Sequence, residues 1–317
     1  MNIPPIKKIT EQSLTEAADL IRRGELVAFP TETVYGLAAN ACSDEAVAKI
    51  FAAKGRPTFN PLIVHVTNVG EAQTHTVFND SADKLAAMFW PGALSFVLPK
   101  QSKSNVSALV TAGLDTMAIR NPAHPAALEL LKQVQTPIAA PSANRSGCLS
   151  PTTAKHVAEH FGSRVSLILD GGECGVGVES TILDLSSGAP VLLRPGGVTV
   201  EEFESFIGSL SQRPVSKILA PGMLENHYAP KTPIRINAHN CSSNEAVLAY
   251  GSQPLTGGKF MENLSTEGNL IEAAGNLFRM LHILDKRNCS QIAVMPIPNE
   301  GLGLAINDRL KRASTQT

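Results

Sequence analysis

Two cations lie on either side of a glycine in the segment Lys54-Gly55-Arg56-Pro57. The glycine permits a tight turn and the proline fixes the chain that leaves it, so both cationic side chains should be held rigidly. Arginine offers a planar fork of donors and lysine a point charge, and a rigid pair of this kind suits a polyphosphate. The alternative is that Lys54 and Arg56 are only favourable cations at the C-terminal end of a helix, where each contributes about 0.3–1 kcal/mol.

Hydroxyl and amide side chains gather in a second polar segment, which contains Ser142, Asn144 and Ser150 and precedes a predicted helix over residues 153–161. Such groups, with the backbone N–H groups near the start of the helix, are suited to binding phosphate. Simple capping of the loop is the alternative.

Short runs of branched aliphatic residues, each closed by Pro, Gly or a polar residue, predict strands in the first two thirds of the chain. These strands are residues 26–30, 61–66, 95–99, 117–120, 137–142, 167–170, 181–185 and 191–194. Helices are predicted between some of them, over residues 44–54, 82–89, 125–134 and 153–161. Arg120, Ser180 and Arg194 stand at strand ends, where open α/β sheets bind ligands. We therefore expect an α/β domain with a large sheet and a ligand site at its edge.

The regular pattern stops near residue 210. Residues 211–233 contain four prolines and no clear period, which is typical of a linker. After it, strands are predicted over residues 234–237, 246–250 and 292–297, and helices over residues 271–284 and 305–313. The expected domains are residues 1–210, the linker 211–233, and a small Rossmann-like α/β domain of residues 234–317. His227 and Tyr228 are unusual in a linker and suggest that this segment docks on another part of the protein.

Composition excludes several classes of protein. With 27 basic and 28 acidic residues the formal net charge is -1, so a generally basic nucleic-acid coat protein is excluded, and 5% aromatic residues argue against a base-stacking platform. Five cysteines without a CxxC pair make a disulfide framework or zinc knuckle improbable. The first ten residues lack the apolar stretch of a signal peptide, and no apolar run is long enough to span a bilayer. We expect a cytoplasmic protein without a membrane segment.

Familiar cofactor motifs are absent from the sequence. It contains no GxxxxGK[ST] loop, no GxGxxG before a helix and no GxSxG elbow. His156 and His160 are four residues apart but lack an evident third ligand, so no metal site is predicted.

Ten short motifs occur in order along the chain: PTETVYGL (30–37), KGRP (54–57), NPLIVHV (60–66), FWPG (89–92), APSANRSG (140–147), SPTTA (150–154), GVEST (177–181), LRPGG (193–197), HYAP (227–230) and GLGLAINDRLKRA (301–313). Together they resemble the YrdC-like threonylcarbamoyl-AMP synthases, and the last two resemble the two-domain branch with a C-terminal extension. The resemblance implies a YrdC-like twisted mixed sheet. It also implies a nucleotidyltransferase that makes L-threonylcarbamoyladenylate and pyrophosphate from L-threonine, bicarbonate or CO₂, and ATP, for the threonylcarbamoyladenosine modification of tRNA.

The resemblance also implies site residues. Those for threonine are Thr33, His65, Arg120, Ala140 through its backbone, and Ser180. Those for ATP are Arg56, Asn60, Thr116, Ser142, Asn144, Ser150, Arg194 and Tyr228. Lys54 and Arg56 are the expected catalytic residues, with Lys54 facing a carboxylate or the phosphates. Mg²⁺ is expected to accompany ATP, and downstream tRNA-modification proteins are expected partners, with weak tRNA contact left open.

The chemistry fits the residues independently of the resemblance. A carbamate must attack the α-phosphorus of a triphosphate, so mutual repulsion of anions makes much of the barrier, and fixed positive charge lowers it. Tyr228 is expected to act as part of a lid over the nucleotide. Two alternatives stay open: a non-catalytic RNA-binding module, and a hydrolase or carbamoyl-transfer factor on the same fold.

Overall fold

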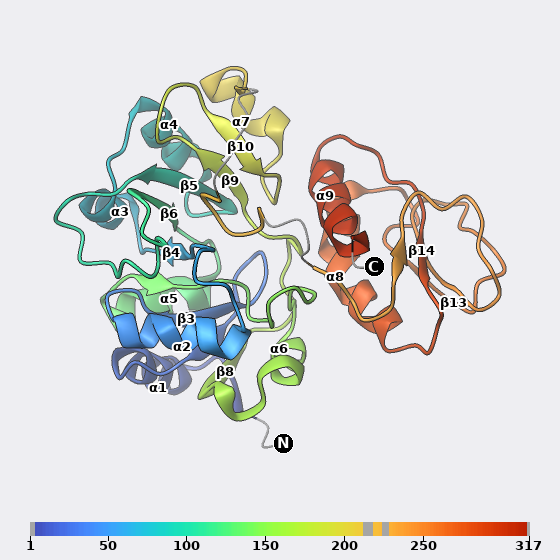
Figure 1. Cartoon of the computed structure of the whole chain (residues 1–317), viewed down its shortest axis with the longest axis horizontal. Helices are drawn as coiled ribbons and strands as arrows, with labels where there is room; N and C mark the ends of the chain where they lie inside the picture. Colours follow the sequence, from blue (N-terminus) through green and yellow to red (C-terminus); the bar gives the residue numbers. More distant parts are fainter. Residues whose placement is uncertain (1–3, 212–217, 224–227, 316–317) are drawn as a thin grey trace.

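The computed structural model describes residues 4–211, 218–223 and 228–315. Two sheets organise them (Figure 1). The larger has ten strands in the order β1-β8-β2-β3-β7-β4-β6-β5-β9-β10, and the smaller has four in the order β11-β14-β12-β13. The predicted fold class, a mixed α/β sheet followed by a small α/β domain, is confirmed.

The strands of the large sheet are β1 (Ile6–Lys8), β2 (Val27–Phe29), β3 (Gly36–Asn40), β4 (Ile63–His65), β5 (Leu94–Pro99), β6 (Thr116–Arg120), β7 (Ile138–Ala139), β8 (Leu167–Asp170), β9 (Thr181–Asp184) and β10 (Val191–Arg194). Its helices are α1 (Glu11–Arg22), α2 (Asp44–Lys54), α3 (Val69–His75), α4 (Asp80–Phe89), α5 (Pro125–Val134), α6 (Ala154–Phe161) and α7 (Val200–Ile207). The small domain contains β11 (Ile234–Arg235), β12 (Ala246–Ala249), β13 (Phe260–Asn263), β14 (Ile292–Val294), α8 (Leu270–Asp285) and α9 (Leu302–Ser314).

The large sheet is mixed. The pairs β1/β8, β2/β8, β4/β6 and β5/β9 are parallel, and the remaining pairs are antiparallel. The parallel register of β4 and β6 sets His65 beside Arg120 at the carboxyl ends of both strands. The small sheet is parallel throughout.

Several elements lie outside those predicted: β1, β3, β13, α1, α3 and α7. The strand β3 consists mostly of small residues and continues a polar loop. It therefore lacks the run of branched aliphatics that marks a strand, yet four of its five residues are buried. Burial between β2 and β7 therefore outweighs its weak intrinsic preference.

Caps at both ends fix α2, which carries Lys54. The Ser43 hydroxyl accepts a hydrogen bond from the N–H of Ala46 at the start, and Gly55 ends the helix in a left-handed conformation at φ 61°. The chain therefore reverses between Lys54 and Arg56.

The two domains share a hydrophobic core. Val34, Leu149 and Val178 of the large domain pack in one cluster with the apolar faces of α8 and α9, which are the small domain's elements nearest the large one in Figure 1. Gly177 approaches α8 so closely that a Cβ there would lie 2.3 Å from the carbonyl oxygen of Ala274. Side chains larger than hydrogen would push the domains apart at this point.

Part of the predicted linker is packed rather than loose. Residues 212–217 and 224–227, and so His227, lie outside the described residues, but Tyr228 and Ala229 are buried. Ala229 donates its N–H to the carbonyl of Gly147 at 2.8 Å, which docks the segment on the large domain. The five cysteines, all within the described residues, are unpaired. No helix in the described ranges is long and apolar enough to cross a membrane.

Candidate active site

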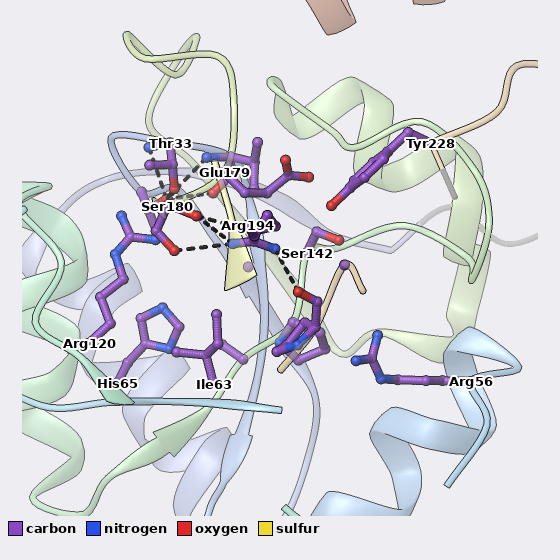
Figure 2. A pocket seen from close by; sticks show the side chains of 17 residues that line it. Thr33, Arg56, Ile63, His65, Arg120, Ser142, Glu179, Ser180, Arg194 and Tyr228 are labelled. Carbon is purple, nitrogen blue, oxygen red and sulfur yellow. Dashed lines mark hydrogen bonds between the residues drawn. The ribbon is translucent and has the colours of Figure 1, made fainter. Parts of the chain in front are cut away.

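A cavity opens at the edge of the large sheet, where loops after β2 and β7 meet the ends of β4, β6 and β10. Nine of the residues expected from the sequence line it: Thr33, Arg56, His65, Arg120, Ala140, Ser142, Ser180, Arg194 and Tyr228. Figure 2 shows Arg120 and His65 at one end, Arg56 and Tyr228 at the other, and Ser142 and Arg194 between them. The cavity therefore has two ends, each with its own guanidinium.

Arg120 organises the first end. Its Nη1 donates to the hydroxyl of Thr33 at 3.0 Å, its Nε donates to the carbonyl of Gly92 at 3.1 Å, and Nη2 forms an ion pair with Glu32. Burial opposes ionisation of Glu32, but the adjacent Arg120 charge holds the Glu32 pKa below its ordinary value. The guanidinium is therefore fixed in orientation by three contacts from two loops before any ligand arrives.

His65 lies beside Arg120 as a neutral imidazole. The side chain is buried, and burial together with the Arg120 charge lowers the pKa of His65 to about 3. Its Nδ1 is buried without a hydrogen-bond partner among the described residues. Since a buried polar atom without a partner is costly, this nitrogen is suited to meeting a polar group of a ligand.

Arg56 and Arg194 form the second end and its approach. Arg56 donates to the backbone carbonyl of Asn60 at 3.0 Å, to the Asn60 side-chain oxygen at 2.6 Å, and to the carbonyl of Pro61 at 2.7 Å. Arg194 donates to the carbonyl of Ser180 at 2.8 Å and to that of Pro221 at 3.3 Å. Neither guanidinium forms an ion pair with an acid in the described part of the chain. Burial lowers the pKa of both guanidiniums, which shows that burying their charges is unfavourable. An anion bound between them would offset part of this cost.

Lys54 does not line the cavity. Its ammonium is buried behind the loop and donates to the carbonyl of Ser142 at 2.5 Å and to the carbonyl of Asn144. This placement corrects the expectation that Lys54 faces a carboxylate or phosphates. The reason is the reversal at Gly55, which turns Lys54 inward and leaves Arg56 on the cavity side.

Four other expected residues also lie outside the cavity lining. The Asn60 oxygen holds Arg56, the Asn144 amide donates to the carbonyls of residues 145 and 148, and the Ser150 hydroxyl donates to Glu179. Asn60 and Ser150 therefore support cavity residues from behind, whereas Asn144 holds the loop that follows Ser142. Thr116 begins β6, whereas Arg120 ends it, and four residues of strand span about 13 Å. Thr116 is therefore far from the guanidinium of its own strand.

Glu179 lines the cavity but was not among the expected site residues. It is 6% exposed and is the one carboxylate among the described lining residues. Burial would raise its pKa, but Arg309, then Arg194, hold the pKa of Glu179 down at about 2. Gly222 also lines the cavity: at φ 84° it passes so close to Arg194 that a Cβ would lie 2.8 Å from its Cδ. The only sequence feature that could have indicated Gly222 is that it is a glycine within a proline-rich segment.

Comparisons with known proteins identify the family of the chain. Residues 19–196 match the family Sua5_yciO_yrdC, described as "Telomere recombination", and residues 198–315 match Sua5_C, described as "Threonylcarbamoyl-AMP synthase, C-terminal domain". The chain is 42% identical to a threonylcarbamoyl-AMP synthase of Pyrococcus abyssi, with 97% of this chain and 96% of that protein covered. It is 41% identical to one of Bacillus subtilis, with 96% and 93% covered. The crystal structure of P. abyssi Sua5 complexed with L-threonine superposes with a TM-score of 0.89 at 41% identity, with 99% of this chain and 97% of that one covered. The chain therefore belongs to the threonylcarbamoyl-AMP synthase family, in its two-domain form.

Proposed function

We propose that this synthase assembles threonylcarbamoyl-AMP in the cavity described above, from L-threonine, bicarbonate or CO₂, and ATP, and releases pyrophosphate. One observation carries the proposal: the buried guanidiniums of Arg56, Arg120 and Arg194 converge on one cavity. A site of this kind gathers anions that repel one another in water. The relatives named for this activity match nearly the whole chain, which supports the same conclusion.

The Arg120 end is the proposed threonine site. The guanidinium offers its fork to the carboxylate, with Thr33 and Glu32 holding it in place. The unpartnered Nδ1 of His65 is available to the threonine hydroxyl, and the Ala140 backbone and the Ser180 hydroxyl complete the lining. A hydrogen bond to the hydroxyl is needed because a methyl group alone discriminates by only about 1–3 kcal/mol. The P. abyssi relative is complexed with L-threonine, which supports threonine as a ligand of this chain as well.

The Arg56 end is the proposed nucleotide site, with Arg194 and Ser142 toward the phosphates and Tyr228 over the nucleoside. Asn60 orients Arg56, and Lys54 with Asn144 shapes the loop that carries Ser142. These three residues therefore act through others rather than on the substrate. Geometry gives no support to a contact between Thr116 and ATP.

The reaction needs no covalent enzyme intermediate. The neutral threonine amine attacks CO₂ and releases one proton to solvent, or it reacts with bicarbonate and releases one water molecule; either reaction forms the carbamate. A carbamate oxygen then bonds to the α-phosphorus while the bond to the β-phosphate oxygen breaks, which releases pyrophosphate. Arg194 and Arg56 would stabilise charge on the phosphates, and Arg120 would hold the carboxylate of the same threonine so that its amine end points toward them.

Mg²⁺ is proposed to enter with ATP. No group of three or more His, Cys, Asp or Glu side chains in the described ranges is arranged to hold a metal ion. Glu179, the carboxylate of the cavity, already accepts from Ser150 and Arg309. The ion would therefore be held mainly by phosphate oxygens and water, as is usual for Mg²⁺, and would neutralise their charge. Calorimetry should show Mg²⁺ binding only when ATP is present.

Product analysis tests the function directly. Pyrophosphate release is measured with threonine, bicarbonate and ATP together and with each omitted in turn, and the adenylate is identified by mass. Dependence on all three is expected. Release of phosphate or AMP without threonine would instead indicate the hydrolase alternative, and salt-sensitive tRNA binding without turnover would indicate the RNA-binding module.

Location and partners follow from this chemistry as part of the same proposal. We infer that the protein works in the cytoplasm, which the unpaired cysteines support. The adenylate is reactive, so proteins that transfer its threonylcarbamoyl group to tRNA are proposed as downstream partners. Co-purification of these proteins with the tagged full chain would test this point.

A further inference from the structure

The C-terminal helix α9 reaches the catalytic cavity through one side chain. Arg309 is 1% exposed, and its Nε donates to Oε2 of Glu179 at 2.8 Å. The other oxygen of Glu179 accepts from Ser150. An arginine from the small domain thus neutralises the carboxylate that lines a cavity in the large one, 130 residues away in the chain.

Arg309 also supports the proposed lid residue. Its guanidinium carbon lies 5.0 Å from the centre of the Tyr228 ring, and Phe278 of α8 packs on the same ring at 5.7 Å. Tyr228 has a positive φ of 64°, a strained conformation for a non-glycine residue that persists only where the surroundings hold it. Both cavity residues, Glu179 and Tyr228, are therefore held by the small domain.

The charge of Glu179 is opposite to what the cavity requires. An unpaired carboxylate there would repel the phosphates and attract Arg194, whose guanidinium is bonded to the carbonyl of the adjacent Ser180. Pairing with Arg309 removes this conflict and leaves Arg194 available to an incoming anion. Asp308, at 2.6 Å from Nη1 of Arg309, holds the guanidinium from the other side.

We propose that Arg309 is a positioning residue for the nucleotide end of the cavity: by pairing with Glu179 and lying against Tyr228, it makes ATP binding depend on the docked C-terminal domain. The proposal rests on the function argued above. It assigns to the small domain a role in the chemistry of the large one, through a single buried ion pair.

The test uses full-length variants and steady-state kinetics with ATP and threonine varied separately. Arg309→Met keeps the bulk of the side chain but removes its charge, and should raise KM for ATP roughly 10- to 100-fold, the effect of one uncompensated charge several ångströms away at an effective dielectric constant near 20. KM for threonine should change much less. Lys311→Met, an exposed cation of the same helix, is the matched control and should match the wild type.

Two further measurements separate this role from a merely structural one. In Arg309→Met the pKa of Glu179 should rise, since Arg309 is the foremost charge that lowers it. KM for ATP should then improve as the pH falls and Glu179 is protonated, a dependence that the wild type lacks. In the double variant Glu179→Gln/Arg309→Met the carboxylate and its guanidinium partner are removed together, so this variant should recover most of the lost ATP affinity. It also provides the test if the single variant does not fold.

The outcomes are distinct. A wild-type protein that forms no adenylate would overturn the proposed function, whatever the variants do. An active wild type with Arg309→Met indistinguishable from Lys311→Met would overturn the role of Arg309. A folded double variant that binds ATP as poorly as Arg309→Met, or more than roughly tenfold more weakly than the wild type, would also overturn this role. The proposal requires that removing the Glu179 carboxylate restores ATP affinity when Arg309 is absent.

Discussion

Replacement of Lys54 by methionine distinguishes a catalytic lysine from one that shapes the cavity. The ammonium donates to the carbonyls of Ser142 and Asn144. Each charge-assisted hydrogen bond contributes about 1.5–3 kcal/mol, so removing two costs about 3–6 kcal/mol. Relief from burying an ammonium offsets part of this, since burial and the Arg56 charge already lower the Lys54 pKa. We expect a net loss of about 2–4 kcal/mol in the free energy of unfolding.

For a chain of 317 residues, this loss corresponds to a fall in Tm of roughly 3–6 °C, given about 2.1 cal/mol/K of unfolding entropy per residue. The loop that carries Ser142 should loosen as well, which raises KM for ATP while kcat falls by roughly tenfold or less, as expected when positioning rather than chemistry is lost. Circular dichroism and pyrophosphate release measure the two effects. Lys84→Met, at an exposed position of α4, is the control for the substitution itself.

The opposite result would refute the reasoning. If Lys54→Met unfolds at the wild-type temperature but loses roughly three orders of magnitude or more in kcat, then Lys54 acts on the reacting groups, as the sequence suggested, and not on the loop.

Three further changes probe the two ends of the cavity and the buried acid. Arg120→Lys keeps the charge but not the planar fork, so KM for threonine should rise roughly 10- to 100-fold with KM for ATP nearly unchanged in initial-rate measurements. Gly222→Ala places a methyl group 2.8 Å from Cδ of Arg194 and should weaken ATP binding in calorimetry, whereas Gly188→Ala, at φ 64° with open space around it, should cost only backbone strain of about 1 kcal/mol in stability. Glu179 should make stability depend on pH: its folded pKa of about 2 lies below the ordinary 4.5, so its contribution is full above about pH 4.5 and is lost as the pH falls through about 2. Urea unfolding across this range should show the loss, and the same titration of Glu179→Gln should lack it.

The elements that carry the cavity residues were predicted correctly wherever a local sequence pattern determines the structure. The strands before His65, Arg120 and Arg194 are short aliphatic runs, and each delivers its polar end to the cavity. The serine cap and glycine stop of α2 are readable from residue types alone. These features depend on neighbours within a few residues, and that is the information a single sequence carries.

The features that could not be predicted from the sequence depend on contacts between residues far apart in the chain. Lys54 and Arg56 look equivalent in the sequence, but the acceptors of Lys54 lie 88 and 90 residues away, so nothing local shows that it turns inward. No role for Glu179 could be predicted from the sequence, because its partner Arg309 is 130 residues distant. The strand β3 could not be predicted for a related reason. Its mostly small residues form a strand only because β3 is buried between β2 and β7, and this pairing is not visible in the local sequence.

Charge explains why the cavity needs so many supporting contacts. Arg56 and Arg194 are buried and form no ion pair among the described residues, so the folded protein bears the cost of desolvating them before ATP arrives. Backbone carbonyls of residues 60, 61, 180 and 221 offset that cost in part, because each accepts from a guanidinium without neutralising its charge. A carboxylate in their place would stabilise the empty protein more but would compete with the phosphates. Glu179, the one acid among the described residues that line the cavity, is accordingly paired with an arginine from the other domain, which keeps the positive charge of the cavity for its substrates.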